Sequence, residues 1–167
     1  MEPMVTVILA AGRGTRMKSE LVKVLHPVAG RPMLAYPVAA ARAVGSQRII
    51  VVAGYQKDKV EAALQGQQVD IALQAEQLGS GHAVLMAAPQ LAGFAGDVLI
   101  LCGDVPLVTT ATLEAFLKAH RENKACVSVL TVELDNPAGY GRILRTDNQL
   151  CGIVEHRDAT EAQRAVR

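Results

Sequence analysis

Short apolar runs rich in β-branched residues recur along this chain of 167 residues, and segments with helical spacing separate them. The first run reads MVTVILAA over residues 4–11. A continuous apolar run of this length is typical of a strand that is covered on both faces of a sheet. Strands that alternate with helices form largely parallel sheets with right-handed crossovers. The sequence therefore predicts an α/β fold in which helices flank a mostly parallel sheet.

The same patterns place the individual elements. We expect strands over residues 4–11, 48–53, 69–73, 98–102 and 126–132. We expect helices over residues 32–44, 58–65 and 82–88, and a further helix capped by Thr110. Pro37 should mark an irregular start or a kink in the first helix. A small β-hairpin near the C-terminus is expected where residues 142–145 and 150–154 flank Asp147-Asn148.

Composition excludes several classes of protein. Hydrophobic residues make up 50% of the chain and the net charge is +1, so neither disorder nor the charge-driven wrapping of nucleic acid is expected. No apolar run approaches the ~20 residues of a membrane helix, and no signal peptide is visible. The cysteines, Cys102, Cys126 and Cys151, form no C-x-x-C pair. We therefore expect buried, reduced thiols in a cytoplasmic protein and no zinc site.

A glycine-rich basic loop, Gly12 to Arg16, follows the first strand directly. Ligands of open α/β sheets bind at the carboxyl ends of the strands, where this loop must lie. Its glycines let backbone N–H groups approach an anion, and Lys18 and Lys23 add to its positive charge. The segment predicts a polyphosphate cradle, although a loop of merely solvated basic residues is the alternative. Met17 occupies the position where both a Walker A loop and a dinucleotide fingerprint require glycine.

Five segments in order resemble the sugar-nucleotide pyrophosphorylases, which are Rossmann-like nucleotidyltransferases. Within that family they are most similar to the bacterial bifunctional N-acetylglucosamine-1-phosphate uridylyltransferase/glucosamine-1-phosphate N-acetyltransferases. The resemblance covers essentially the whole chain and predicts a truncated N-terminal uridylyltransferase domain over residues 1–167. The matching segments are LAAGRGTRM at 9–17 followed by KVL at 23–25, QAEQLGSGHA at 74–83, LCGDVPL at 101–107, NPAGYGRI at 136–143 and IVEHRDA at 153–159.

The resemblance implies a set of site residues. Arg16 and Lys23 would neutralise the phosphates, and Asp104 would hold a catalytic Mg²⁺, a cation that prefers oxygen ligands. Gln74 would meet the uracil edge. The implied nucleotide-binding residues are Leu9, Ala10, Ala11, Gly12, Lys23, Gln74, Gly79 and Ser80. The implied sugar-binding residues are Cys102, Gly103, Asp104, Gly141 and Glu155.

The implied reaction joins UTP and N-acetylglucosamine 1-phosphate to give UDP-N-acetylglucosamine and pyrophosphate. Such relatives carry a C-terminal β-helix that acetylates glucosamine 1-phosphate and forms a homotrimer, and we expect this sequence to lack it. Cys102 and Val22 stand where the family usually has tyrosine and proline. Two alternatives stay open: a nucleotidyltransferase for another base or sugar phosphate, and an inactive nucleotide-binding fragment.

Overall fold

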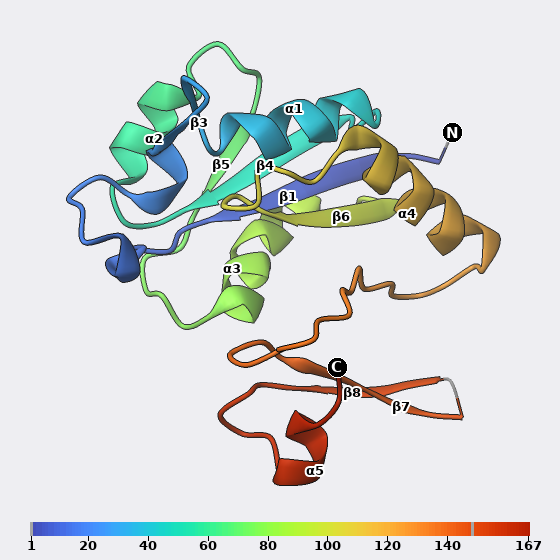
Figure 1. Ribbon diagram of the computed structural model, residues 1–167. Coiled ribbons are helices and arrows are strands. Elements are labelled where there is room, and N and C mark those ends of the chain that lie inside the picture. The colour runs from blue at the N-terminus through green and yellow to red at the C-terminus, as the bar shows by residue number, and fades with distance from the viewer. Residues whose placement is uncertain (1, 148) are drawn as a thin grey trace. The chain divides into compact units, whose positions relative to one another are not determined.

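In the computed structural model, which describes residues 2–147 and 149–167, four parallel strands form one sheet in the order β5-β4-β1-β6 (Figure 1). β1 lies in the interior of this sheet, and six of its seven residues pair with β4 on one side and six with β6 on the other. The expected α/β fold with a parallel sheet is therefore confirmed. The strands are β1 (Met4–Ala10), β4 (Arg48–Ala53), β5 (Asp70–Leu73) and β6 (Asp97–Cys102).

Helices cover both faces of β1 and β4 (Figure 1). Ile8 and its same-face neighbours pack against α1 (Ala35–Ala43) and α2 (Lys57–Ala63). Val7 and its same-face neighbours pack against α3 (Ser80–Ala87). Because successive side chains of a strand point to opposite faces, an unbroken apolar run is what a strand covered on both faces requires.

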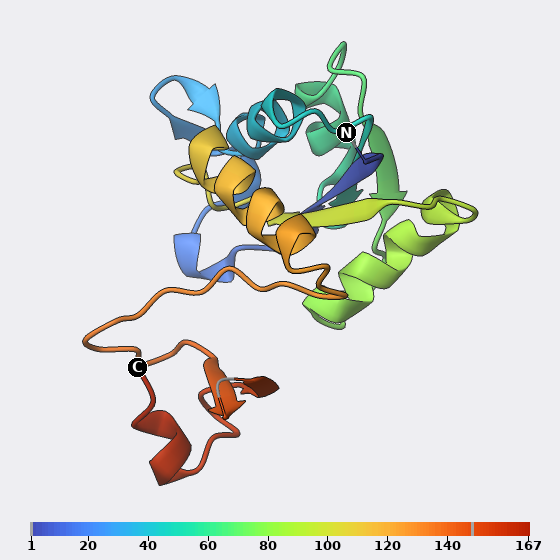
Figure 2. The same ribbon diagram turned by 90° about the vertical axis from the view of Figure 1, so that its right-hand side faces the viewer.

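A further helix, α4 (Thr110–Glu122), packs against α1 and β6 (Figure 2). Its buried Leu113 contacts this layer, as does Leu117 one turn later. The N-cap is Thr109 rather than the expected Thr110, because the Thr109 hydroxyl accepts a hydrogen bond from the backbone N–H of Thr112 at 3.1 Å.

Short elements connect these layers. The 3-10 helices are η1 (Thr15–Met17), η2 (Lys23–Leu25) and η3 (Ala88–Leu91), and the two-residue strands are β2 (Pro27–Val28) and β3 (Arg31–Pro32). No helix among the described residues is long and apolar enough to cross a membrane.

The chain divides into two compact units, one ending at Ala119 and one comprising His120–Arg167. The second unit contains the antiparallel pair β7 (Arg142–Thr146) and β8 (Gln149–Val154), followed by α5 (Glu161–Arg164). This pair confirms the expected hairpin; Asn148, which was expected between the two strands, lies outside the described residues. The short helix was not expected from the polar residues 155–167. Thr160 and Gln163 form a capping box, and the T-x-x-Q spacing was the signal for it.

Three local expectations are wrong. Residues 126–132 do not form a strand, because they pair with no other segment. Residues of high β-propensity form a strand only where a neighbouring strand is available for pairing. α1 begins at Ala35 rather than at residue 32, so Pro37 lies in its first turn, where a missing N–H costs no intrahelical bond. All three cysteines are exposed rather than buried.

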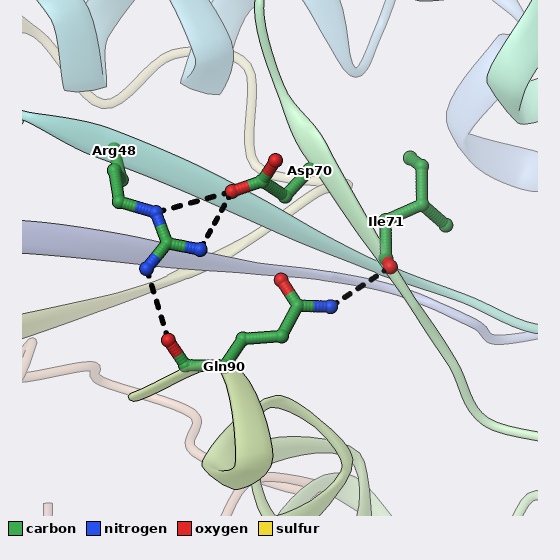
Figure 3. Close-up of polar contacts among 4 residues, drawn as sticks. All are labelled: Arg48, Asp70, Ile71 and Gln90. Atoms are coloured by element: carbon green, nitrogen blue, oxygen red, sulfur yellow. Dashed lines mark hydrogen bonds and ion pairs between the residues drawn. The ribbon is translucent and has the colours of Figure 1, made fainter. Parts of the chain in front are cut away.

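A group of hydrogen bonds connects η3 to the amino ends of β4 and β5 (Figure 3). The Arg48 guanidinium donates to the Asp70 carboxylate at 2.8 Å and to the Gln90 backbone carbonyl at 3.0 Å. The Gln90 amide in turn donates to the Ile71 carbonyl at 2.9 Å. These contacts lie at the end of the sheet opposite the carboxyl ends of the strands, so they stabilise the framework rather than a ligand site.

Burial predicts a clear difference between two isoleucines. Ile50 is fully buried between the helical layers, whereas Ile100 is 47% exposed on β6. Ile50→Ala should lower the free energy of unfolding by about 2–5 kcal/mol, because it leaves a cavity in the core. The matched Ile100→Ala should cost less than about 1 kcal/mol. Urea unfolding measures both values, and equal losses would contradict the burial described here.

Candidate active site

The sheet reverses its strand order beside β1, and this point defines the candidate site. From β1 the chain moves to β4 and then outward to β5, after which it returns to form β6 on the opposite side of β1. In open α/β sheets, such a reversal leaves a crevice outside the carboxyl ends of the strands. The segments that follow β1, β5 and β6 carry the glycine loop, Gln74 and Asp104, so all three segments start from this edge.

Asp104 lies at the end of β6, immediately beside the end of β1. The backbone N–H of Gly103 donates to the carbonyl of Leu9 at 2.8 Å, which extends the pairing of the two strands by one residue. A Cβ at position 103 would lie only 2.8 Å from that carbonyl oxygen, so glycine is required for this close approach. The position of Asp104 is therefore set by the strand pairing itself.

Lys23 reaches the same point from the other side of the glycine loop. Its Nζ donates to Oδ2 of Asp104 at 2.6 Å, and the two side chains are 31% and 37% exposed. Gly14 packs against it with a φ of +66°, and a Cβ there would lie 2.5 Å from the Lys23 Cβ. The structure thus joins the loop, Lys23 and Asp104 into one solvent-accessible cluster.

The remaining basic residues of the loop differ in their surroundings. Arg16 lies in η1 and is exposed, and no acidic side chain within residues 2–147 and 149–167 pairs with it. The Arg13 guanidinium lies over the Tyr55 ring, 5.5 Å from its centroid. Arg13 therefore has a partner within the chain, whereas Arg16 leaves its charge available to an anion.

Gln56 is a positioning residue that sequence reasoning missed. Its side-chain Oε1 accepts from the backbone N–H of Val22 at 3.1 Å, and its Nε2 donates to the carbonyl of Glu20 at 2.6 Å. These two bonds hold the segment directly before Lys23. The residue itself has a φ of +54°, which few side chains adopt, but a lone glutamine at a strand-to-helix turn gives no recognisable signal in the sequence.

Gln74 marks the opposite side of the β1 end from Asp104. It follows β5, donates its backbone N–H to Ala53 at 2.8 Å, and is only 3% exposed. Gly54 allows these segments to meet, because a Cβ there would lie 2.7 Å from the Gln74 carbonyl and 3.1 Å from the Ala11 Cβ. Ala11 and Gln74 are thus brought together, with Gly79 accepting a hydrogen bond from the Gln74 amide at 3.1 Å. A Cβ at Gly12 or Gly79 would meet nothing within 4 Å, so both positions face open space.

The second unit brings two other predicted residues together. Gly141 and Glu155 directly precede β7 and follow β8, whose register pairs Arg142 with Val154. A Cβ at Gly141 would lie 4.0 Å from Oε2 of Glu155. Arg142 is buried and donates to the carbonyls of Tyr140 and Arg164, which fixes this end of the hairpin. Cys102, Gly103 and Asp104, predicted for the same sugar, belong to the first unit.

Asp104 could hold a divalent cation only together with ligands from a substrate. No group of three or more His, Cys, Asp or Glu side chains among the described residues is arranged to bind a metal. Mg²⁺ commonly binds through one or two carboxylates, with phosphate oxygens and waters as its other ligands. One partly exposed carboxylate beside a basic, glycine-rich loop fits a cation that takes its other ligands from phosphate oxygens and water.

The neighbours of Cys102 shift its ionisation. Desolvation of its sulfur raises the pKa of the thiol above its ordinary value, and the negative charge of Asp104 raises this pKa further. Lys23 acts in the opposite direction. A raised pKa lowers the thiolate fraction at neutral pH, so Cys102 is not an activated nucleophile.

Comparison with known proteins identifies the class. Residues 6–165 match the family described as the MobA-like NTP transferase domain. The chain therefore belongs to this family of nucleotidyltransferases.

A closer relationship is visible in sequence. The chain is 52% identical over 168 residues to the bifunctional protein GlmU of Geotalea uraniireducens, an alignment that covers 99% of this chain and 37% of that protein. It is homologous to the N-terminal region of GlmU and spans little more than a third of its length.

Solved structures support the same class. A nucleotidyl transferase from Methanothermobacter thermautotroptrophicus is 28% identical and superposes with a TM-score of 0.60 over 70% of this chain and 57% of its own. Rv0371c of Mycobacterium tuberculosis, solved in complex with manganese, is 24% identical and shares the fold with a TM-score of 0.60 over 72% of this chain and 60% of its own.

The contact between Gly14 and Lys23 makes a prediction about stability. Gly14→Ala should lower the free energy of unfolding by roughly 1–3 kcal/mol, because the new Cβ meets Lys23 and the backbone has a positive φ. Gly12→Ala, where a Cβ meets nothing, should change the value by less than about 0.5 kcal/mol. Chemical denaturation measures both, and an unchanged Gly14→Ala variant would contradict the packing of the loop on Lys23.

The ionisation of Cys102 gives a second prediction. In a protein carrying Cys126→Ser and Cys151→Ser, Asp104→Asn should lower the pKa of the Cys102 thiol, because it removes a charge that raises this pKa. The rate of alkylation by iodoacetamide at pH 8 should then rise roughly two- to fivefold, since the thiolate is the reactive form. Lys23→Met should slow the reaction. A slower reaction in the Asp104→Asn variant would show that the two side chains are not neighbours.

Proposed function

We propose that this domain transfers a uridylyl group from UTP to N-acetylglucosamine 1-phosphate. A phosphate oxygen of the sugar phosphate attacks the α-phosphorus of UTP, the bond from that phosphorus to the oxygen bridging to the β-phosphate breaks, and pyrophosphate leaves. No protein nucleophile is needed, because the attacking phosphate is already ionised. The observation that carries the proposal is the Lys23–Asp104 pair beside the glycine loop, at the end of β1.

Three side chains supply charge in this proposal. Arg16, exposed and without an acidic partner among the described residues, is proposed to stabilise the leaving pyrophosphate. Lys23 neutralises the reacting phosphates, and fixed cations of this kind stabilise the charge that develops in phosphoryl transfer. Asp104 would hold Mg²⁺, which would contribute further positive charge at the phosphates. The manganese in the Rv0371c structure supports a divalent cation.

The proposal also assigns residues to the two substrates, following the family resemblance. Gln74, with Leu9, Ala10, Ala11, Gly12, Gly79 and Ser80, is proposed to bind the nucleotide. Cys102, Gly103 and Asp104 are proposed as sugar-phosphate contacts, and Gly141 and Glu155 are proposed as sugar contacts. The proximity of Gly141 to Glu155 supports the sugar assignment, because a backbone N–H and a carboxylate can meet the amide and hydroxyl groups of one sugar.

The name of the GlmU relative describes a bifunctional protein, and this chain matches only 37% of it. We propose that residues 1–167 belong to the uridylyltransferase part. Acetylation of glucosamine 1-phosphate and trimer formation would then belong to the part of such relatives that this chain does not match. Cysteines that are all unpaired suit a reducing compartment, and the cytoplasm stays a prediction.

The reaction is tested by pyrophosphate release. UTP with N-acetylglucosamine 1-phosphate and Mg²⁺ should release pyrophosphate, and CTP, GTP and dTTP should be poorer substrates. Preference for another nucleotide would overturn the uridylyl assignment while leaving the nucleotidyltransferase class intact. Nucleotide binding without release from any pair of substrates would favour the binding fragment.

The proposed role of Asp104 predicts the effect of removing its charge on turnover. Asp104→Asn should reduce Mg²⁺-dependent kcat/KM by ~10²-fold or more, because the amide is a weak ligand for a hard cation. The matched Asp70→Asn variant changes a carboxylate at the opposite end of the sheet and should retain kcat/KM within about twofold. Comparable turnover in the Asp104→Asn variant and the unaltered protein would count against the metal role.

A further inference from the structure

The buried amide of Gln74 has both of its N–H donors engaged within the chain. Its Nε2 donates to the carbonyl of Gly79 at 3.1 Å and contacts Nδ1 of His82 at 3.0 Å. Gly79 is the N-cap of α3, and His82 is the third residue of that helix. One short segment therefore supplies both partners of the amide nitrogen.

These two contacts fix which way the amide points. A carbonyl oxygen can only accept a hydrogen bond, so the Gln74 atom that faces Gly79 must be the NH₂ group. Rotating the amide by 180° would place Oε1 against that carbonyl, with two acceptors in contact in a buried position. The second N–H points to His82, whose Nδ1 must therefore be the acceptor. The tautomer that provides this acceptor carries its ring proton on Nε2.

The atom left for a ligand is Oε1. No described residue donates a hydrogen bond to it, while the Gln74 side chain as a whole is only 3% exposed. A pyrimidine with a proton on N3, such as uracil, can donate to this oxygen. Cytosine presents an unprotonated N3, which would set two acceptors against each other, and buried polar mismatches of this kind are strongly disfavoured.

We propose that His82 is a positioning residue that holds the Gln74 amide with its carbonyl toward the base and thereby sets the preference for uracil over cytosine. The inference rests on the proposed function, since it assumes that Gln74 meets the base. His82 acts through Gln74 and does not touch the reacting phosphates. Without an acceptor at the Nδ1 position, the amide loses one of the two contacts that fix its orientation.

The test compares the dissociation constants of UTP and CTP by calorimetry in the full chain. His82→Phe keeps a ring of similar size but removes the acceptor, and the preference for UTP should fall by about tenfold or more. His82→Asn places Oδ1 near the position of Nδ1, and it should keep the preference within about threefold. His120→Phe, the same change in the second unit, serves as the matched control and should leave the preference unaltered.

A preference that is unchanged in His82→Phe, or absent from the unaltered protein, overturns the inference, as does an equal loss in His82→Asn. A second measurement does not depend on how the variants fold. In the unaltered protein, a long-range ¹H–¹⁵N spectrum should show Nδ1 of His82 without a proton, and a proton on Nδ1 would overturn the proposal. Neither measurement requires turnover. Failure of pyrophosphate release would therefore refute the proposed reaction, whereas the calorimetry and the spectrum decide this inference.

Discussion

The placement of β1 between β4 and β6 is the constraint on which the rest of the structure depends. Parallel pairing on both sides buries the strand, so its residues are apolar on both faces except for Thr6, whose buried hydroxyl hydrogen-bonds to Ser46. The same pairing brings the carboxyl ends of three strands to one edge of the sheet. The chain departs from β1 in one direction and returns to it from the other, and ligands of open α/β sheets bind beside such a reversal. The position of every candidate site residue in the first unit follows from this arrangement.

The two sides of the end of β1 differ in their chemistry. On the β6 side, Lys23 and Asp104 form a charged pair that remains accessible to solvent. On the β5 side, Gln74 is a neutral, buried amide whose surroundings determine its orientation. The glycine loop connects the two sides. A nucleotide triphosphate, with a neutral base at one end and a highly charged phosphate chain at the other, matches this division of properties.

Most of the framework could be predicted from the sequence because its signals are strong and local. The apolar runs at residues 4–11 and 48–53 predicted β1 and β4, and the glycine loop was placed correctly after the first of them. The segment 126–132 failed for a physical reason, since its alternating valines favour a strand but pairing depends on a distant partner. The burial of Cys102 and Cys151 was predicted wrongly because hydrophobic character does not determine which side of an edge strand a residue faces, and Cys126 lies on no strand.

The candidate site was predictable in its residue types but not in its supporting contacts. Asp104 and Lys23 lie 81 positions apart, and their pairing at 2.6 Å follows from the register of β1 with β6. Gln56 and His82 were missed as positioning residues because each acts through another side chain or a backbone group. A single glutamine or histidine has many structural uses, and only coordinates show which atoms it meets.

The segment before Lys23 illustrates how one loop can be held by alternative means. Val22 has a φ of −58°, close to the value that a pyrrolidine ring imposes, so its backbone already has the shape that an imino acid would enforce. Here the shape is maintained instead by the bond from its N–H to Gln56. An imino acid at this position would restrict the unfolded chain but would leave the oxygen of Gln56 without its donor. Residues 22 and 56 should therefore vary together among related proteins. Where position 22 is proline, position 56 should no longer need to be glutamine.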